Sequence, residues 1–137
     1  MTAGYSGTPL AKKLGLKPGM RAWFQNLPDS VRAEIDRDAP PLERLDLPER
    51  PLQFAHIFVT RCALLDCELR MLLPLLDPAG MIWVSWPKKA SKVPTDITED
   101  VIREIALPLH FVDVKVCAVD EIWSGLKLVI RREHRAA

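Results

Sequence analysis

The chain has 137 residues, a length that suits one domain able to bury about two-thirds of the surface that its unfolded form exposes. Hydrophobic residues make up 48% and charged residues 27%, which excludes disordered, collagen-like and coiled-coil proteins. Nineteen Lys and Arg against eighteen Asp and Glu leave a charge of +1, without the basic excess of a dedicated nucleic-acid or membrane binder.

The start of the chain predicts an arm and a short helix within residues 1–19. Residues 1–10 are polar and glycine-rich and contain no apolar signal core. Thr8 and Pro9 suit the cap and first position of a helix that Gly15 would end. We expect the preceding arm to form an ordered latch that packs Tyr5 against the domain.

The rest of the chain alternates strand-like and helix-like segments. Apolar and aromatic runs predict strands at 20–25, 54–60, 81–86, 111–119 and 126–132. Helices are predicted from Asp29, from Arg61 to about Leu72, and from a capping Asp96 to about Leu107. Residues 36–53 are rich in proline and hold at most a short strand at 44–47. Val112, Val114, Val116 and Ala118 should share one face of their strand.

This order predicts an α/β fold: one compact, Rossmann-like domain over residues 1–137, with a mostly parallel sheet and helices on both faces. The connection at 120–125 is too short for a crossover, so the strand at 126–132 should return antiparallel. The strands at 44–47 and 54–60 are also too close in sequence to be neighbouring parallel strands joined by a helix.

The cysteines and the lack of a targeting segment favour a cytoplasmic protein. The apolar stretches are far too short to span a bilayer. Cys62, Cys67 and Cys117 are an odd number without C-x-x-C spacing, and we expect them to be reduced, buried thiols. Cys62 and Cys67 stand five positions apart and share no helix face, so we predict no zinc site.

The segment from Phe54 to Arg132 resembles the C-terminal half of a class I S-adenosylmethionine (SAM)-dependent methyltransferase. The shared features are a buried strand, a helix ending in Leu75–Gly80, a second strand, a further helix and a terminal hairpin. Lys17–Met20 is similar to the approach to that family's nucleotide-binding strand. Three segments resemble a small bacterial family known as a domain of unknown function, namely Gly4–Gly15, Trp86–Ser91 and Lys115–Gly125. The resemblance implies a methyltransferase-like fold and no mechanism.

The turn after the first strand departs from the methyltransferase pattern. Methyltransferases place a glycine-rich loop there, so that backbone can approach the adenosyl ligand. This chain has Gln25–Ser30, in which Leu27 adds bulk and Pro28 removes an amide donor. In methyltransferases an acid at the end of the second strand usually holds the ribose hydroxyls. In this chain only Asp46 or Glu49 could take that role. The sequence therefore assigns no cofactor, and SAM is the alternative.

A candidate ligand site lies beyond the carboxyl ends of the strands, where open parallel sheets bind ligands. The residues that this rule selects are Asn26, Ser30, Trp86, Lys88, Lys89, Asp120 and Trp123. Lysine ammonium groups suit phosphate and an indole can stack on a base, so a small anionic or nucleotide-like ligand fits this set. The alternative for each residue is an ordinary solvated loop position.

Several polar residues are assigned structural roles instead. His56 lies in an apolar strand and is predicted to be a hydrogen-bonded core histidine, and His110 to mark a strand entrance. Asp120 and Glu121 are adjacent, so an ion pair or a turn cap is favoured over an acid/base dyad.

These observations favour a non-catalytic binding or regulatory module that takes a small anionic ligand or a protein partner at the strand ends. A SAM-dependent methyltransferase with an atypical cofactor loop is the alternative, so the sequence leaves open whether the protein is an enzyme. No membrane or nucleic-acid partner is expected, and the catalytic residues stay unassigned. A third hypothesis is a homo-oligomer paired through an edge strand at 126–132, although Arg131 and Arg132 would discourage that pairing.

Overall fold

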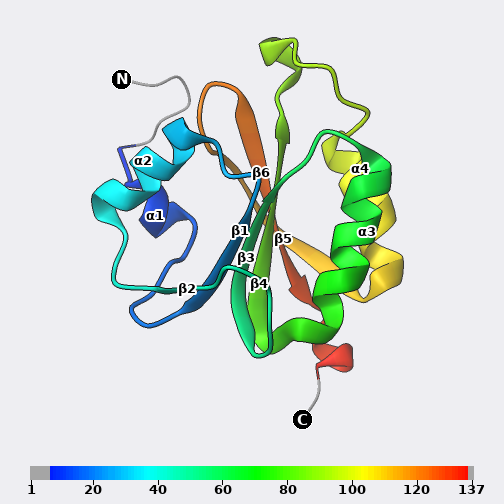
Figure 1. Ribbon diagram of the computed structural model, residues 1–137. Coiled ribbons are helices and arrows are strands. Elements are labelled where there is room, and N and C mark those ends of the chain that lie inside the picture. The colour runs from blue at the N-terminus through cyan, green and yellow to red at the C-terminus, as the bar shows by residue number, and fades with distance from the viewer. Residues whose placement is uncertain (1–6, 136–137) are drawn as a thin grey trace.

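The computed structural model describes residues 7–135 and arranges six strands in one sheet between helices (Figure 1). The predicted packing of Tyr5 lies outside the described residues. The strands are β1 (Arg21–Gln25), β2 (Glu43–Arg44), β3 (Leu52–Phe58), β4 (Leu76–Pro87), β5 (Phe111–Ala118) and β6 (Trp123–Ile130). The α-helices are α1 (Leu10–Lys13), α2 (Asp29–Asp38), α3 (Cys62–Leu72) and α4 (Glu99–Ala106). Short 3-10 helices are η1 (Leu73–Leu75), η2 (Lys89–Ser91), η3 (Leu107–Leu109) and η4 (Arg132–His134).

The sheet has the order β2-β1-β3-β4-β6-β5. Strands β2, β1, β3 and β4 pair in parallel, and β6 is antiparallel to both of its neighbours, β4 and β5. This arrangement confirms the predicted Rossmann-like, mostly parallel sheet with an antiparallel C-terminal strand.

Helices cover both faces of the sheet, α1 and α2 one face and α3 and α4 the other (Figure 1). Strand β3 is buried on both sides because its side chains alternate between two cores. Phe54 and Phe58 belong to the core under α1 and α2, whereas Ala55 and Ile57 belong to the core under α3 and α4. Among the described residues, no helix has the length and apolar character needed to cross a membrane.

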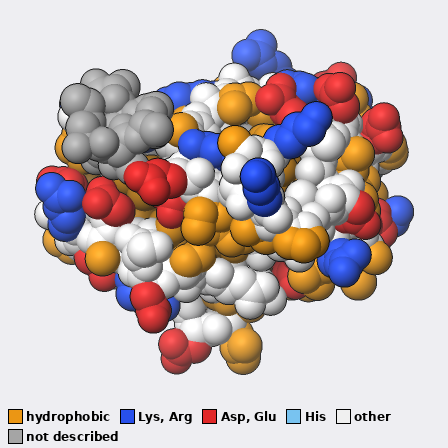
Figure 2. All heavy atoms as spheres, turned by 90° about the horizontal axis from the view of Figure 1, so that it is seen from above, with side chains coloured by type: hydrophobic (Ala, Val, Ile, Leu, Met, Phe, Trp, Pro, Cys, Tyr) orange, Lys and Arg blue, Asp and Glu red, His pale blue; other side chains and the backbone are white. Residues whose placement is uncertain are grey.

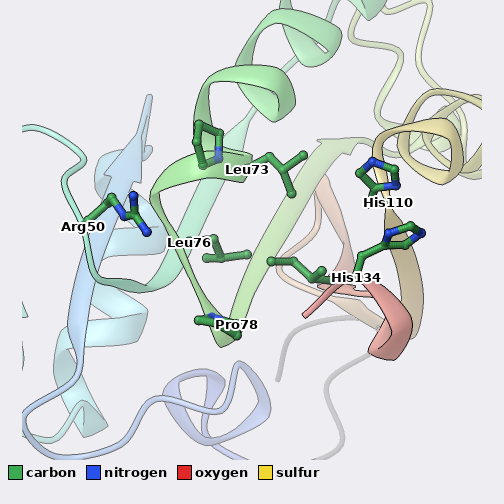
Figure 3. A pocket seen from close by; sticks show the side chains of 8 residues that line it. Arg50, Leu73, Leu76, Pro78, His110 and His134 are labelled. Atoms are coloured by element: carbon green, nitrogen blue, oxygen red, sulfur yellow. The ribbon is translucent and has the colours of Figure 1, made fainter. Parts of the chain in front are cut away.

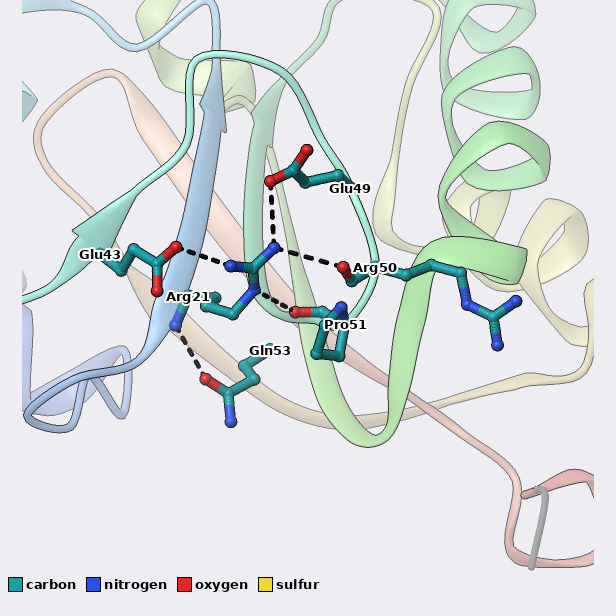
Figure 4. A network of polar contacts seen from close by, with 6 residues as sticks. All are labelled: Arg21, Glu43, Glu49, Arg50, Pro51 and Gln53. Atoms are coloured by element: carbon teal, nitrogen blue, oxygen red, sulfur yellow. Dashed lines mark hydrogen bonds and ion pairs between the residues drawn. The ribbon is translucent and has the colours of Figure 1, made fainter.

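Strands β2 and β3 lie on opposite sides of β1, and the chain between them contains no helix, as their short separation predicted. Arg21 holds this connection at the start of β1 (Figure 4). Its guanidinium donates to the Glu43 carboxylate at 2.6 Å, to the Glu49 carboxylate at 3.2 Å and to the backbone oxygen of Pro51 at 2.8 Å. The backbone N–H of Arg21 donates to the Gln53 side chain at 2.8 Å. One side chain thus fixes the path that replaces a crossover helix.

The prediction that residues 126–132 form an edge strand is wrong. Strand β6 lies inside the sheet between β4 and β5, and Arg131 and Arg132 follow it outside the sheet. The hypothesis of an oligomer paired through that segment loses its basis, because the segment already has a strand on each side.

At this side of the sheet the edge strand is β5. A bulge in β5 reverses the alternation of its side chains between the two faces. The register with β6 shifts between Asp113 and Lys115. As a result Phe111 packs in the core under α3 and α4, whereas Cys117 packs in the core under α1 and α2. The predicted single face of valines is therefore wrong, since the extra residue, Val114, separates the two halves of the strand.

Two predicted helix caps are also wrong. Asp96 does not cap α4; its carboxylate accepts the backbone N–H of Cys62 at 2.7 Å and so caps α3 across a loop. Thr98 caps α4 by accepting the N–H of Val101 at 3.2 Å. At the start of the chain Pro9, and not Thr8, is the cap residue of α1.

Strand β4 begins at Leu76, five residues earlier than expected. Residues 77–80 form an irregular stretch within the strand, and the pairing with β3 continues on both sides of it. Leu52 pairs with Leu76, and Phe54 pairs with Met81. Gly80 permits this geometry, since a Cβ there would lie 2.9 Å from the backbone oxygen of Leu52.

The expectation of three buried thiols holds only in part. Cys117 is buried and Cys62 is half-buried, but Cys67 is exposed on α3.

Candidate functional site

The carboxyl ends of the parallel strands meet at one edge of the sheet, the upper edge in Figure 1. Figure 2 views this edge from above and shows Lys and Arg side chains beside hydrophobic ones across its middle. The chain passes from β1 to β2 on one side and from β3 to β4 on the other. The strand order therefore reverses between β1 and β3, and a ligand crevice is expected at that point.

Asn26 occupies this reversal point. Its backbone has a φ of 56°, the left-handed conformation that glycine adopts most easily and that asparagine tolerates better than other residues. Its side-chain amide donates to the backbone oxygen of Phe58 at 3.5 Å, a long hydrogen bond that joins the ends of β1 and β3. The turn thus has a glycine-like backbone without glycine, and the exposed Asn26 side chain joins the ends of β1 and β3 where the crevice is expected.

Of the two acids that could follow the second strand, only Asp46 remains a candidate. The Glu49 carboxylate is paired with Arg21, at the opposite end of β1. Asp46 is exposed, has no ion-pair partner among residues 7–135, and lines a pocket of about 270 Å³ with Leu45, Leu47 and the same Glu49. Because Arg44 pairs with Ala22, Asp46 lies about two residues short of the level of Asn26.

Trp86 and Lys89 line a second pocket of about 390 Å³ on the α4 side of the sheet. Pro87, Thr95, Ile97, Thr98 and Glu99 complete its walls. Trp86 is only 8% exposed, so it forms a wall of the pocket and not a surface platform for stacking. Among the described residues, neither the Lys89 ammonium nor the Trp86 indole N–H has a hydrogen-bond partner.

Asp120 and Trp123 lie on the other side of the sheet. The Asp120 carboxylate accepts the backbone N–H groups of Ile122 at 2.8 Å and Trp123 at 2.7 Å, which confirms its predicted role as a turn cap. The Trp123 ring packs edge-on against Phe58, with centroids 5.2 Å apart.

The structure therefore divides the seven predicted ligand residues instead of gathering them. Trp86 and Lys89 belong to the pocket beside α4, whereas Asn26 and Trp123 both contact Phe58 on β3. Lys88 is half-buried and its backbone N–H donates to Ile122 at 2.7 Å. Ser30 is exposed in the first turn of α2.

Sequence analysis did not identify Glu68, a buried carboxyl group on α3. It is 9% exposed, accepts a hydrogen bond from the Gln25 amide at 3.3 Å, and has one oxygen without a partner among the described residues. Burial raises the pKa of Glu68 above its ordinary value. The spacing of Leu65, Leu69 and Leu72 already places position 68 on the buried helix face. Gln25 ends β1, so Glu68 lies behind the turn that Asn26 begins.

Two histidines have the structural roles that the sequence predicted. His56 is fully buried and its Nε2 lies 2.7 Å from the Ser85 hydroxyl, while burial lowers its pKa to about 3. His110 has a φ of 77° immediately before β5. Across residues 7–135, no three His, Cys, Asp or Glu side chains are grouped so that they could hold a metal ion.

No protein-family model matches this sequence, and the search of curated proteins finds no relative. Solved structures do share its fold. A SAM-dependent methyltransferase from Aquifex aeolicus has a TM-score of 0.63 at 14% identity, over 93% of this chain and 90% of that one. The ribosomal protein L11 methylase from Lactobacillus delbrueckii subsp. bulgaricus has a TM-score of 0.55 at 9% identity, over 90% and 76%. A methyltransferase from Pyrococcus furiosus has a TM-score of 0.54 at 12% identity, over 87% and 79%.

These TM-scores establish a common fold. At identities this low they say nothing of the activity, which must be argued from the site. The methyltransferase-like fold that the resemblance implied is confirmed. Membership of the small bacterial family stays a prediction.

Proposed function

We propose that this chain is a methyltransferase-like domain that binds SAM in the crevice between the carboxyl ends of β1 and β3. The observation that carries the proposal is the left-handed backbone of Asn26 at the point where the strand order reverses. Sequence analysis disfavoured SAM because the turn lacks glycine. The backbone conformation for which glycine is usually needed is nevertheless present at Asn26. The steric objection to SAM binding is therefore reduced to two side chains, the movable one of Asn26 and that of Leu27.

The residues around the crevice suit an adenosyl ligand in charge and in shape. Asp46 supplies an unpaired carboxylate after β2, the position from which ribose hydroxyls could be accepted. Trp123, half-buried and packed edge-on against the buried Phe58, supplies aromatic surface at the end of β3. When bound, SAM supplies an electrophilic methyl group. The chain's own part is to bind and orient, with the Asn26 amide leaving the Phe58 oxygen to admit the ligand.

Glu68 has a supporting part in this proposal. Through the Gln25 amide it holds the last residue of β1, directly before the turn. It touches no proposed ligand position, so it is a positioning residue and not a catalytic one.

Calorimetric titration with SAM and with its demethylated product, S-adenosylhomocysteine, tests this proposal. The variant Asn26→Gly keeps the left-handed turn and removes the side chain that bridges the crevice, so it should bind both compounds more tightly than the wild type. Lys92→Gly is the matched control, because Lys92 also has a positive φ, of 61°, but lies in another loop. Absence of binding at millimolar concentrations in the wild type and in Asn26→Gly would contradict the proposal.

A second candidate function is a non-catalytic module that binds a small anion in the pocket beside α4. The unpartnered Lys89 ammonium and Trp86 indole N–H favour it, since both are donors and both line that pocket. Native mass spectrometry of freshly purified protein would then find a retained small molecule. Neutralising Lys88 and Lys89 together should release it and leave the melting temperature nearly unchanged, whereas a large loss of stability would assign those lysines a structural role.

A further inference from the structure

A separate pocket lies at the amino edge of the sheet, opposite the proposed SAM crevice. Its volume is about 220 Å³, enough for roughly seven waters at about 30 Å³ each. Figure 3 shows Arg50 at one side, His110 and His134 at the other, and Leu73, Leu76 and Pro78 between them. Segments distant in sequence thus build one hollow with basic groups on opposite sides.

The groups that could carry charge in this pocket are all basic. Arg50, His110 and His134 line it, and no acidic side chain does. Arg131 reinforces the histidine side, because its guanidinium lies 3.4 Å from Nε2 of His134 and its buried Nε has no partner among the described residues. An orphaned donor beside two imidazoles is a place where an anion would be favourable.

The acids on neighbouring elements leave this balance positive. Asp77, at the start of β4, uses its carboxylate to accept the Ala79 N–H at 2.8 Å. Glu133 in η4 lies close to the histidine side of the pocket: its own backbone N–H, and then the charges of Arg131 and His134, hold its pKa below the ordinary value. The remaining charged groups nearby, Arg132 and Arg135, are positive.

The two imidazoles are arranged so that an anion would stabilise them. Their ring centroids lie 3.9 Å apart at an interplanar angle of 33°. Donation from Arg131 requires His134 Nε2 to act as an acceptor, which fits a neutral ring. An anion placed beside these rings and Arg131 could accept hydrogen bonds from their N–H groups.

The floor of the pocket is apolar and firmly held. Leu76 and Ile130 are each 6% exposed and belong to the core under α3 and α4. A ligand that covered this floor would remove apolar surface from water at both partners. The volume lies below the usual range of roughly 300–1,000 Å³ for drug-sized ligands, so the ligand should be small.

We propose that this amino-edge pocket binds a small carboxylate with an apolar chain, its carboxylate beside His110 and His134 and its chain on the leucine floor. The pocket is independent of the SAM crevice, and neither proposal requires the other.

NMR titration of the folded protein with octanoate, 1-octanol and inorganic phosphate tests the proposal. Octanoate should shift the ring resonances of His110 and His134 and leave those of the buried His56 unchanged. Octanol, which lacks the charge, and phosphate, which lacks the chain, should each bind at least tenfold more weakly. Equal binding of octanol, or octanoate shifts that spare both exposed histidines, would overturn the proposal.

Single substitutions give a second readout. His110→Asn and His134→Gln should each weaken octanoate binding at least threefold, and Arg32→Gln, which removes an exposed arginine from α2, should not change it. All three positions are exposed, so the variants should stay folded, which circular dichroism would verify. Equal effects of His134→Gln and Arg32→Gln would show that the loss is not specific to this pocket and would refute the assignment.

Discussion

His56 should make the protein less stable in mild acid. It is fully buried in β3 among aromatic rings, with its ring stacked on Phe58 at 4.3 Å and hydrogen-bonded to Ser85. Burial lowers its pKa from 6.5 to about 3. Below pH 6.5 the unfolded chain therefore takes up a proton that the folded protein refuses until about pH 3, so the free energy of unfolding falls as the pH falls.

These two pKa values set the size of the effect. Lowering the pH from 7.5 to 5.5 should cost about 1 kcal/mol of stability from His56 alone, and lowering it to 4.5 about 3 kcal/mol. Other groups titrate over the same range, so a variant that lacks the imidazole is needed to isolate this contribution. His56→Gln keeps a polar group near Ser85 and removes the titration.

Urea unfolding followed by tryptophan fluorescence at pH 7.5 and 5.5 would measure the effect. The difference in free energy of unfolding between the wild type and His56→Gln should shrink by about 1 kcal/mol at the lower pH. Ser85→Ala keeps the imidazole, so its difference from the wild type should change little with pH. If the His56→Gln difference were the same at both pH values, His56 would not be held neutral by burial.

Three further predictions concern stability and the reactivity of a thiol. Arg21→Met should cost about 2 kcal/mol in urea unfolding, because it strips hydrogen bonds from two carboxylates and the Pro51 carbonyl, and Arg21→Lys should recover only part. Gly80→Ala should cost about 1–3 kcal/mol because its Cβ would lie 2.9 Å from the Leu52 oxygen, and an unchanged midpoint would contradict that contact. Cys67, exposed on α3, should react with a thiol reagent in the native state before Cys117 does.

The strands and helices could be predicted because the pattern of apolar residues depends on local geometry. The run at 54–60 indicated a strand covered on both faces, and β3 has Phe54 in one core and Ile57 in the other. The short connection at 120–125 similarly required the antiparallel return of β6.

Strand order at the edge and the partners of caps could not be predicted, because both depend on contacts between distant segments. In the final hairpin it is β6, and not β5, that pairs with β4. The sequence of the hairpin does not show which of its two strands meets β4. Asp96 sits two residues before a helix cap and still caps α3, because the fold brings it to Cys62.

The candidate site was predicted as one set and found as two. The rule of carboxyl strand ends predicts the edge of the sheet at which these residues lie but not the face on which each side chain lies. Trp86 lies near the end of β4 and Trp123 begins the neighbouring strand β6, yet Trp86 packs in the core under α3 and α4 and Trp123 against the core under α1 and α2. Glu68 was not predicted because the rule of strand ends selects only loop residues. The spacing of the leucines nevertheless places position 68 on the buried face of its helix.

The most direct test of the proposed function is amide chemical-shift mapping of the isotope-labelled protein during titration with S-adenosylhomocysteine. Binding in the crevice predicts saturable shifts at Asn26 and Leu27, at the end of β1, and at residues 59–61, after β3. Shifts confined to residues 86–99 would favour the anion-binding module instead, and no shifts at millimolar concentration would contradict the proposal of a SAM-binding domain.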